Sequence, residues 1–324
     1  MAAKIETALD DLSPELEKMF FQVDKTGVEA EKTAYSNYSY WASTMRTFAK
    51  NKVALFFLLL LVALLAFTFI QPYLPNQKDP IEIAIDPETG IQLRNEPPNE
   101  EFIMGTNSIG QDLWARIWSG TRTSMLIGIG VGGFTALMGI IIGSLWGYVP
   151  QLDAPIRWLY NIIHNIPQAI TLVLIAFVLR PSVLTLIFAM CMTRFLNMAK
   201  FIRNQIMIIR DREYNLASRC LGTSTWKIIT KNLLPYLTSV IMLRTALAIP
   251  QAIGSEVFLT YIGLGLPLDV PSLGNLINEG KINMMNEMLR YQLIFPAIVL
   301  SLITISFYVI GTAFSDAADP RNHI

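Results

Sequence analysis

The chain has few of the residues that usually build disulfides, metal centres and catalytic sites. It contains two cysteines and two histidines among 324 residues. Cys191 and Cys220 lack CxxC spacing, and no cluster of Cys, His, Asp or Glu accompanies His164 in the sequence. These absences argue against a disulfide framework, a zinc site and a catalytic base. We expect no cofactor and no metal ion to be bound by this chain.

Nucleotide-binding and catalytic motifs are also missing. There is no GxxxxGK[ST] sequence, so the chain cannot cradle nucleotide phosphates as P-loop ATPases do. No nucleophile paired with a base is recognisable, which argues against a membrane-embedded enzyme. The formal net charge is zero, so the overall composition gives no indication of a nucleic-acid partner. We expect a chain that is not an enzyme.

Hydrophobic residues, by contrast, are abundant. They make up 52% of the chain, whereas only 15% of the residues are charged, which is too apolar for an ordinary soluble fold of this length. A helix needs roughly 20 apolar residues to cross the hydrocarbon core of a bilayer. The sequence therefore predicts an all-α polytopic membrane protein with six transmembrane helices. The predicted spans are residues 53–70, 124–149, 162–179, 182–198, 236–262 and 293–314.

The basic residues indicate how these spans are oriented. Arg46, Lys50 and Lys52 precede the first span, whereas the segment after that span is mainly acidic. An excess of basic residues marks the cytoplasmic side of a membrane protein, so we predict a cytoplasmic amino terminus. Six spans then return the carboxyl tail to the same side. The first apolar run comes after a polar tail too long for a signal peptide, and we expect it to remain as an anchor.

The second span is rich in glycine, with Gly139, Gly143 and Gly147 at four-residue spacing. Small residues four apart let helices approach closely in lipid. Residues 128–133 also match GxGxxG, but the strand, the βαβ unit and the later acidic residue of a dinucleotide site are missing. We interpret these glycines as a packing surface between helices.

Other local patterns predict smaller features. Ile109, Leu113 and Ile117 recur every four residues among polar ones, which is typical of a short helix lying in the outer interface. Residues 75–98 are interpreted as an external loop or small cap, and residues 1–35 as a tail with one short helix. Pro167 and Pro250 are expected to kink their helices.

A strongly basic segment, residues 200–235, separates the fourth and fifth spans. Residues 211–221 favour a helix, which Gly222 can end in a left-handed conformation. Thr223 or Ser224 can cap a second helix, which reaches Pro235. The sequence thus predicts a protruding helix-glycine-helix hairpin on the cytoplasmic side. The alternative is that positive-inside bias alone explains the charges and that the hairpin rests on anionic lipid. The basic residues are Lys200, Arg203, Arg210, Arg212, Arg219, Lys227 and Lys231.

Two charged residues, Arg244 and Glu256, lie within the fifth predicted span, and Arg194 interrupts the fourth. A charge inside the membrane suggests a function because its exposure to lipid costs at least a few kcal/mol. Arg244 and Glu256 are separated by about 18 Å along a helix and cannot pair directly. Glu256 is a candidate for the pathway, a gate or a structural pair. Arg244 is a candidate for the pathway or for a contact with a neighbouring helix.

Several segments, in their order along the chain, resemble one family. Residues 213–222, EYNLASRCLG, followed by Leu233-Leu234-Pro235, resemble the EAA loop of ABC importer permeases. Residues 105–112, GTNSIGQD, resemble the family's GTDxxGRD stretch. Glu256, with 261–265 and 271–274, resembles its segment between spans five and six, and 316–321 resemble its terminal DxxDPR. Together they cover roughly residues 41–321 and resemble the C-type permease of oligopeptide, dipeptide and nickel importers.

The EAA loop departs from the family pattern. Aligning Gly222 with the family glycine places Leu216, Ala217 and Ser218 on the triplet, and Glu213 matches an additional acid upstream. Docking at this loop is therefore expected to rely more on apolar contact than on a salt bridge. The resemblance assigns coupling to the ATPase to Glu213, Leu216, Ala217, Ser218, Gly222, Leu234 and Pro235.

The resemblance implies a type I ABC importer permease fold in the cell membrane of a prokaryote, with both termini in the cytoplasm. It implies as partners a homologous B-type permease, two ATP-binding subunits that hold ATP and Mg²⁺, and an external substrate-binding protein. Oligopeptides or dipeptides are the expected substrates, with nickel or another small solute as the alternative. An ion-coupled secondary transporter is less favoured, because it should hold its coupling ions on intramembrane carboxylates or broken helices near the midplane, and only Glu256 is available, away from the centre. The chain is expected to divide into five parts. A cytoplasmic tail, 1–45, is followed by a first helix with its basic flank, 46–73, and by an external loop with the interfacial helix, 74–123. A five-helix transport core, 124–314, contains the coupling loop 199–235, and a cytoplasmic tail, 315–324, ends the chain.

Overall fold

A computed structural model describes residues 40–180 and 182–319 of the chain. The helix expected within residues 1–35 and the last residues of the DxxDPR match lie outside the described residues. Internal contacts divide the chain after Ser43, and the unit that begins at Thr44 contains every predicted span.

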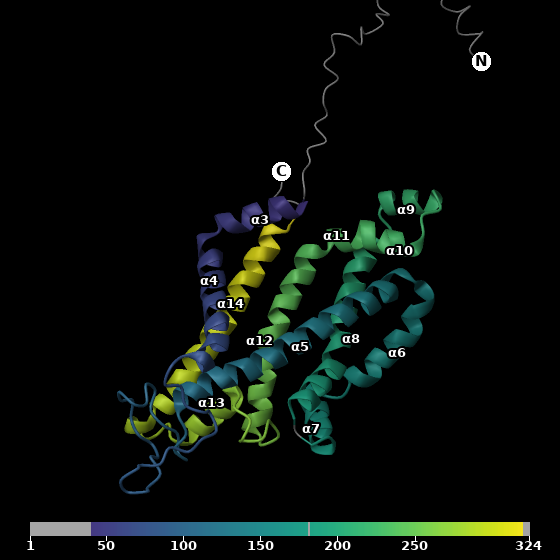
Figure 1. The fold of residues 1–324 in the computed structure, drawn as a ribbon. Coiled ribbons are helices and arrows are strands. Elements are labelled where there is room, and N and C mark those ends of the chain that lie inside the picture. Colours follow the sequence, from purple (N-terminus) through teal and green to yellow (C-terminus); the bar gives the residue numbers. More distant parts are fainter. Residues whose placement is uncertain (1–39, 181, 320–324) are drawn as a thin grey trace, which may run out of the picture. The chain divides into compact units, whose positions relative to one another are not determined.

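The described residues are helical, with isolated β-bridges but no strands (Figure 1). The helices are α3 (Tyr40–Lys50), α4 (Lys52–Ile70), α5 (Leu113–Tyr148), α6 (Asp153–His164), α7 (Gln168–Val178), α8 (Val183–Ile209), α9 (Glu213–Cys220), α10 (Thr225–Ile228), α11 (Leu234–Tyr236), α12 (Thr238–Tyr261), α13 (Leu273–Ile282) and α14 (Tyr291–Ala317). Short 3-10 turns cover Gln71–Tyr73, Pro150–Leu152 and Glu287–Leu289, and a π-helical turn covers Ile229–Leu233.

Five helices of the described part, α4, α5, α8, α12 and α14, are long and apolar enough to cross a membrane. Counted as one broken span, the bent pair of α6 and α7 makes a sixth. The prediction of an all-α protein with six spans is therefore confirmed. α9, α10 and α11 lie at one end of this bundle, and α13 lies at the other (Figure 1).

The helix α5 begins eleven residues before the predicted second span. Its 36 residues extend about 54 Å at 1.5 Å per residue, well beyond the hydrocarbon thickness of about 30 Å. Asp112 starts it, because its side chain accepts a hydrogen bond from the backbone N–H of Ala115 at 3.1 Å. The prediction of a separate interfacial helix at residues 109–118 is therefore wrong, since Leu113 onward forms the first turns of α5.

The third predicted span is broken in the structure. α6 ends at His164, α7 begins at Gln168, and the two helices are bent by 78°. Pro167 is the residue before α7, and a proline has no backbone N–H with which to continue α6. The bend expected at Pro167 is thus present, but as a break between two helices, so the single helix predicted over 162–179 is wrong. Pro250 lies inside α12, which continues through it.

The fourth span is longer than predicted, because α8 continues past Met198 to Ile209. Ile202, Ile206 and Ile209 are buried against the second half of the hairpin, including Ile228 and Ile229. The basic residues from 200 to 209 therefore extend a membrane helix, and the loop begins at Arg210 rather than at residue 199.

Glycines of α5 provide the close packing that the sequence predicts. A Cβ atom on Gly143 would lie 2.9 Å from Cβ of Ile202 in α8. A Cβ atom on Gly132 would lie 2.9 Å from the Ile249 side chain in α12. These approaches allow α5 to contact both neighbours along most of its length, and they establish α5 as the central helix of the bundle.

Residues 74–112, the cap segment, are irregular and contain three isolated β-bridges. The hydroxyl of Tyr291, at the start of α14, lies 2.8 Å from the backbone carbonyl oxygens of Glu96 and Thr106. Gln292 donates to the side chain of Asn95 at 2.9 Å. The expected small cap is therefore present, and α14 holds it in place.

Candidate functional sites: a hairpin, two buried polar clusters and a cavity

The hairpin from Glu213 to Pro235 turns at Gly222, as predicted. Gly222 has a φ of +75°, a left-handed conformation that glycine adopts without a steric cost. The N–H of Gly222 donates to the carbonyl of Arg219 at 2.9 Å, and the N–H of Thr223 donates to that of Ser218 at 3.0 Å. This pair of bonds is a Schellman motif, which satisfies the last carbonyl groups of α9.

The second arm of the hairpin is less regular than the sequence predicts. Instead of one helix up to Pro235, a π-helical turn over Ile229–Leu233 separates α10 from α11. Pro235 lies in α11 and cannot donate an N–H to the preceding turn, which favours the wider turn before it. Ser224 precedes α10, as expected, but its side chain makes no capping bond.

Two asparagines that the sequence patterns do not single out join the arms of the hairpin. Asn215 is fully buried and donates to the carbonyl of Ile209 at 2.9 Å. Asn232 donates to the Asn215 side chain and to the Ser218 hydroxyl, both at 3.2 Å. Among the predicted coupling residues, Ser218 therefore faces the interior of the hairpin. The only sequence signal is that residues 213–235 contain two asparagines, Asn215 and Asn232.

The other predicted coupling residues divide between surface and core. Glu213, Ala217, Gly222 and Pro235 are exposed, whereas Leu234 is partly buried against the base of the hairpin. Large apolar side chains are exposed on the same element: Leu216 is 44% exposed, Trp226 58% and Leu221 84%. An apolar surface on a polar hairpin is typical of a protein interface.

Basic residues of the hairpin and of the turn before it contact the end of α5. Arg210 donates to the carbonyl of Gly147 at 3.1 Å. Arg219 donates to the hydroxyl of Tyr148 at 3.1 Å, and its guanidinium lies over the same ring. Part of the basic charge therefore positions the hairpin against the bundle, so positive-inside bias does not account for all of it.

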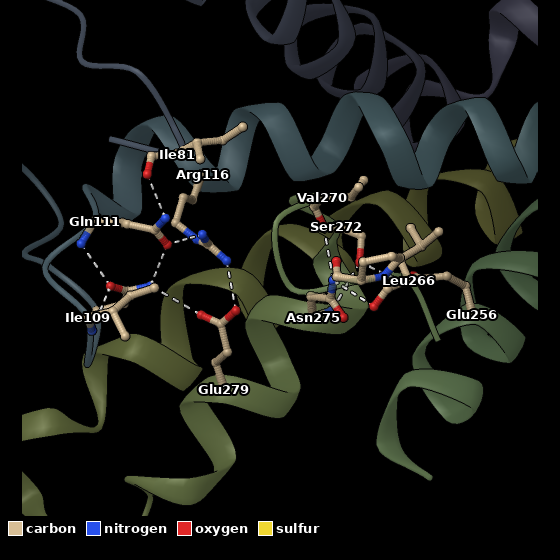
Figure 2. A network of polar contacts seen from close by, with 12 residues as sticks. Ile81, Ile109, Gln111, Arg116, Glu256, Leu266, Val270, Ser272, Asn275 and Glu279 are labelled. Carbon is tan, nitrogen blue, oxygen red and sulfur yellow. Dashed lines mark hydrogen bonds and ion pairs between the residues drawn. The ribbon is translucent and has the colours of Figure 1, made fainter. Parts of the chain in front are cut away.

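Glu256 lies in a closed polar cluster between α12, α5 and the start of α13 (Figure 2). It is fully buried, and the Ser272 hydroxyl donates to its carboxylate at 2.7 Å. The hydroxyls of Ser124 and Thr260 lie at 3.4 Å from it. Ser272 also accepts from the N–H of Asn275 and so begins α13. Glu256 and Arg244 do not share a site.

A second closed cluster surrounds Arg116 of α5, which is fully buried (Figure 2). Its guanidinium pairs with Glu279 of α13 at 2.7 Å and also contacts the side chain of Gln111. Asn107 donates to the other oxygen of Glu279 at 3.2 Å. Burial raises the pKa of Glu279, and the neighbouring Arg116 opposes that rise. Sequence patterns do not indicate this cluster, although GTNSIGQD supplies Asn107 and Gln111.

A cavity of about 140 Å³ lies among α5, α7, α8 and α12; we call it the arginine cavity. Arg194 of α8 donates to the carbonyl of Gln251 at 3.0 Å and to the Ser255 hydroxyl at 2.5 Å. The guanidinium of Arg244 lies 4.5 Å from the centre of the Phe201 ring. The cavity is lined by Thr135, Ala136, Gln168, Arg194, Asn197, Met198, Phe201, Arg244, Thr245, Ala248 and Gln251.

A neighbouring cavity of about 180 Å³ is lined by residues of α6, α7 and α8 and by the break between α6 and α7. Gln168 and Asn197 line both cavities, and His164 lines the second. The polar residues of the membrane helices thus form two kinds of site, the closed clusters around Glu256 and Arg116 and the open arginine cavity.

Comparison with known proteins agrees with this arrangement. Residues 137–324 match the family described as the binding-protein-dependent transport system inner membrane component. Residues 39–98 match the N-terminal TM domain of oligopeptide transport permease C. The chain belongs to the family of binding-protein-dependent transport system inner membrane components. It is thus a multi-pass permease component with the type I ABC permease fold, as the resemblance implied.

Similar proteins cover nearly the whole chain. The oligopeptide transport system permease protein AmiD of Streptococcus pneumoniae is 37% identical over 286 residues, which is 88% of this chain and 91% of that protein. The dipeptide transport system permease protein DppC of Bacillus subtilis is 31% identical over 90% of this chain and 89% of its own length. The oligopeptide transport system permease protein OppC of Bacillus subtilis is 29% identical over 94% of this chain and 97% of its own length.

Proposed function

We propose that this chain is the transmembrane permease subunit of an ATP-driven importer of oligopeptides or dipeptides. The observation that carries the proposal is an exposed apolar helix-glycine-helix hairpin on a permease fold whose similar proteins are oligopeptide and dipeptide permeases. In this proposal a homologous B-type permease forms the other half of the pathway, and an external substrate-binding protein delivers the peptide. The hairpin end faces the cytoplasm and the cap segment faces outside.

Energy enters through the hairpin in this proposal. Two ATP-binding subunits hold ATP and Mg²⁺, and one of them receives the hairpin through Leu216, Leu221 and Trp226, which are exposed. The Gly222 turn and the bonds of Asn215 and Asn232 make the hairpin one rigid element. Closure of the ATPase pair therefore moves hairpin and bundle together, so that the core alternates between inward-open and outward-open states.

The two membrane charges of α12 have different roles in this proposal. Arg244 lines the arginine cavity, and we assign it to the pathway. Glu256 is enclosed by hydroxyl groups, and we assign it to the packing of α13 against the bundle rather than to a gate.

Substrate class is tested by uptake in a strain that lacks this chain and is complemented with it. Uptake of labelled dipeptides and longer peptides should depend on the complementing chain, whereas uptake of Ni²⁺ should not. Complementation that restores only Ni²⁺ uptake would reject a peptide importer in favour of a nickel importer. A free amino acid taken up by other carriers is the control for the energy state of the cells.

Coupling is tested by cross-linking the assembled complex. Ala217→Cys, made in a Cys220→Ser background because Cys220 is exposed, should cross-link to an ATP-binding subunit, with a yield that changes when ATP is added; Ala217 is exposed on α9. Ile282→Cys is the matched control, since Ile282 is 79% exposed on α13 at the opposite end (Figure 1). Equal cross-linking of both variants, or none of Ala217→Cys in a fully assembled complex, would contradict coupling through the hairpin.

A further inference from the structure

The arginine cavity contains many hydrogen-bond donors and no acidic side chain. Its lining residues include two arginines and three amides, Gln168, Asn197 and Gln251, but no aspartate or glutamate. Within the described part of the chain, neither Arg194 nor Arg244 forms an ion pair with a carboxylate. The positive charge of this cavity is therefore not neutralised by the described residues.

Two buried donors at the cavity also lack acceptors. Nε of Arg194 and Nε2 of Gln168 are inaccessible to solvent, and neither has a hydrogen-bond partner among the described residues. A buried donor without an acceptor is costly, and such groups are rare in folded proteins. Because Arg194 comes from α8 and Gln168 from α7, the shortage of acceptors belongs to the cavity rather than to one side chain.

The residues around the cavity hold these donors in place. Arg194 is bound through Nη2 to the Gln251 carbonyl and the Ser255 hydroxyl of α12, which leaves Nη1 for another partner, whereas Nε is closed off from solvent. Phe201 lies under the guanidinium of Arg244 at 4.5 Å. A guanidinium carried by a packed side chain is well suited to a carboxylate, which it can bind through two parallel hydrogen bonds.

The cavity lies deep in the membrane-spanning part of the chain. Arg194 is eleven residues from the start of α8, or about 16 Å along the helix. Arg244 is six residues from the start of α12, or about 9 Å, and the two helices run in opposite directions between the ends of the bundle. Both positions therefore fall within a hydrocarbon core of about 30 Å, where a passing anion would otherwise be poorly solvated.

We propose that the arginine cavity is a carboxylate-binding site on the transport pathway, in which Arg194, Arg244 and Gln168 hold the carboxylate of a peptide in transit. This inference depends on the proposed function as a peptide permease, and it adds the chemical group that is recognised. The carboxylate comes either from the peptide carboxyl terminus or from an acidic side chain. The other possible source, a carboxylate of the partner permease, would make the cavity an assembly contact instead.

The test uses the complete importer, purified and reconstituted in vesicles with its binding protein. Three labelled peptides of equal length are compared: one with a free carboxyl terminus, its carboxy-terminal amide, and the amide with one residue replaced by glutamate. Arg194→Gln and Arg244→Gln are the test variants. Arg290→Gln is the matched control, because Arg290 is half exposed near the cap segment and pairs with Glu287.

We expect Arg194→Gln and Arg244→Gln to lower uptake of the free-carboxyl peptide by about tenfold, the factor that 1.4 kcal/mol represents. Uptake of the neutral amide should change by less than about twofold, and Arg290→Gln should behave as the wild type. Reduced uptake of the glutamate-containing amide would show that the cavity accepts either carboxylate. If only the free-carboxyl peptide is affected, the cavity recognises the carboxyl terminus.

Other results would overturn the inference. If Arg194→Gln and Arg244→Gln lowered uptake of all three peptides equally, with normal assembly and ATPase activity, the arginines would not recognise a carboxylate. Release of the partner permease from Arg194→Gln or Arg244→Gln complexes would assign the arginines to assembly.

Gln168→Ala, which retains both arginines, should still lower the preference for the free-carboxyl peptide by a few fold, and an unchanged preference would contradict the site. A wild-type complex that imports no peptide, while its ATPase activity responds to the binding protein, would instead reject the proposed function, and the inference with it.

Discussion

Two regions of the molecule use similar residues in opposite ways: the closed clusters around Arg116 and Glu256, and the arginine cavity. Arg116 and Glu256 are fully buried, and hydrogen-bonding partners from α13 and its first turn enclose them. Arg194 and Arg244 remain accessible and face a space with surplus donors. A buried charge that is paired within the chain, as Arg116 is with Glu279, mainly fixes how helices pack, because removing one partner leaves the other uncompensated. An accessible arginine without a carboxylate partner is available to an anionic ligand.

The largest effect should come from Arg116→Ala, which leaves the partly buried Glu279 without its cation. We expect a loss of about 3–5 kcal/mol in stability, the usual cost of breaking a buried pair, seen as a lower melting temperature of the purified complex. Arg157→Ala, which breaks an exposed pair with Asp153, should cost about 1 kcal/mol or less.

Arg244→Ala should have the opposite profile to Arg116→Ala. Because Arg244 has no carboxylate partner in the part of the chain described here, its removal should change the melting temperature little while it impairs uptake. A stability loss as large as that of Arg116→Ala would show that the two regions do not differ.

A smaller effect is expected from Ser272→Ala, which removes the donor to Glu256 and the cap of α13. The expected cost is about 1–3 kcal/mol, again measured as thermal stability of the complex. Ser182→Ala is the matched control, since Ser182 is an exposed cap that accepts from the N–H of Thr185 at 3.1 Å. If the two variants lose the same stability, the bond to Glu256 adds nothing to the cap.

Glu256→Gln should have a smaller effect still, because the amide oxygen can still accept from Ser272. Uptake at equal abundance of the complex should stay within about twofold of the wild type, since a buried charge can often be replaced by a neutral group of similar volume. A complete loss of uptake with normal assembly would move Glu256 from packing to gating.

The smallest effect concerns Asp112 at the start of α5. Burial raises the pKa of this carboxyl group, so the folded state disfavours its ionised form relative to the unfolded state. Its contribution to stability is fully present below the ordinary pKa of 3.8 and is lost as the pH rises through the higher pKa of the folded state. Asp112→Asn keeps a good cap and should be as stable as the wild type or slightly more stable at pH 7, with a smaller difference at pH 5. The prediction would be wrong if Asp112→Asn lost stability relative to the wild type as the pH rose from 5 to 7.

Local patterns predict some elements well. The uncharged run 53–70 forms α4, and Gly222 forms the left-handed turn of the hairpin, because composition and backbone conformation decide both within a few residues. Helix ends are predicted less well. The start of α5 at Leu113 and the continuation of α8 to Ile209 depend on tertiary burial, in which Arg116 and Ile206 contact residues distant in sequence.

The partners of membrane charges could not be predicted in the same way. Glu256 meets Ser124 and Ser272, which are 132 and 16 residues away in sequence, and no local period indicates such a meeting. In the sequence, Arg194 is recognisable only as an interruption of an apolar run. Its surroundings become clear in the structure, where α7 and α12 place Gln168 and Gln251 beside it around one cavity.

The unbroken course of α8 from Val183 to Ile209 has a mechanical consequence. Arg194 and the last turn, which packs against the hairpin, belong to one stiff rod and are separated by fifteen residues, or about 22 Å. A displacement of the hairpin end of this rod would also move the guanidinium of Arg194 relative to Gln251 and Ser255 of α12. A force applied at the surface would thus reach the interior of the bilayer without any intervening hinge.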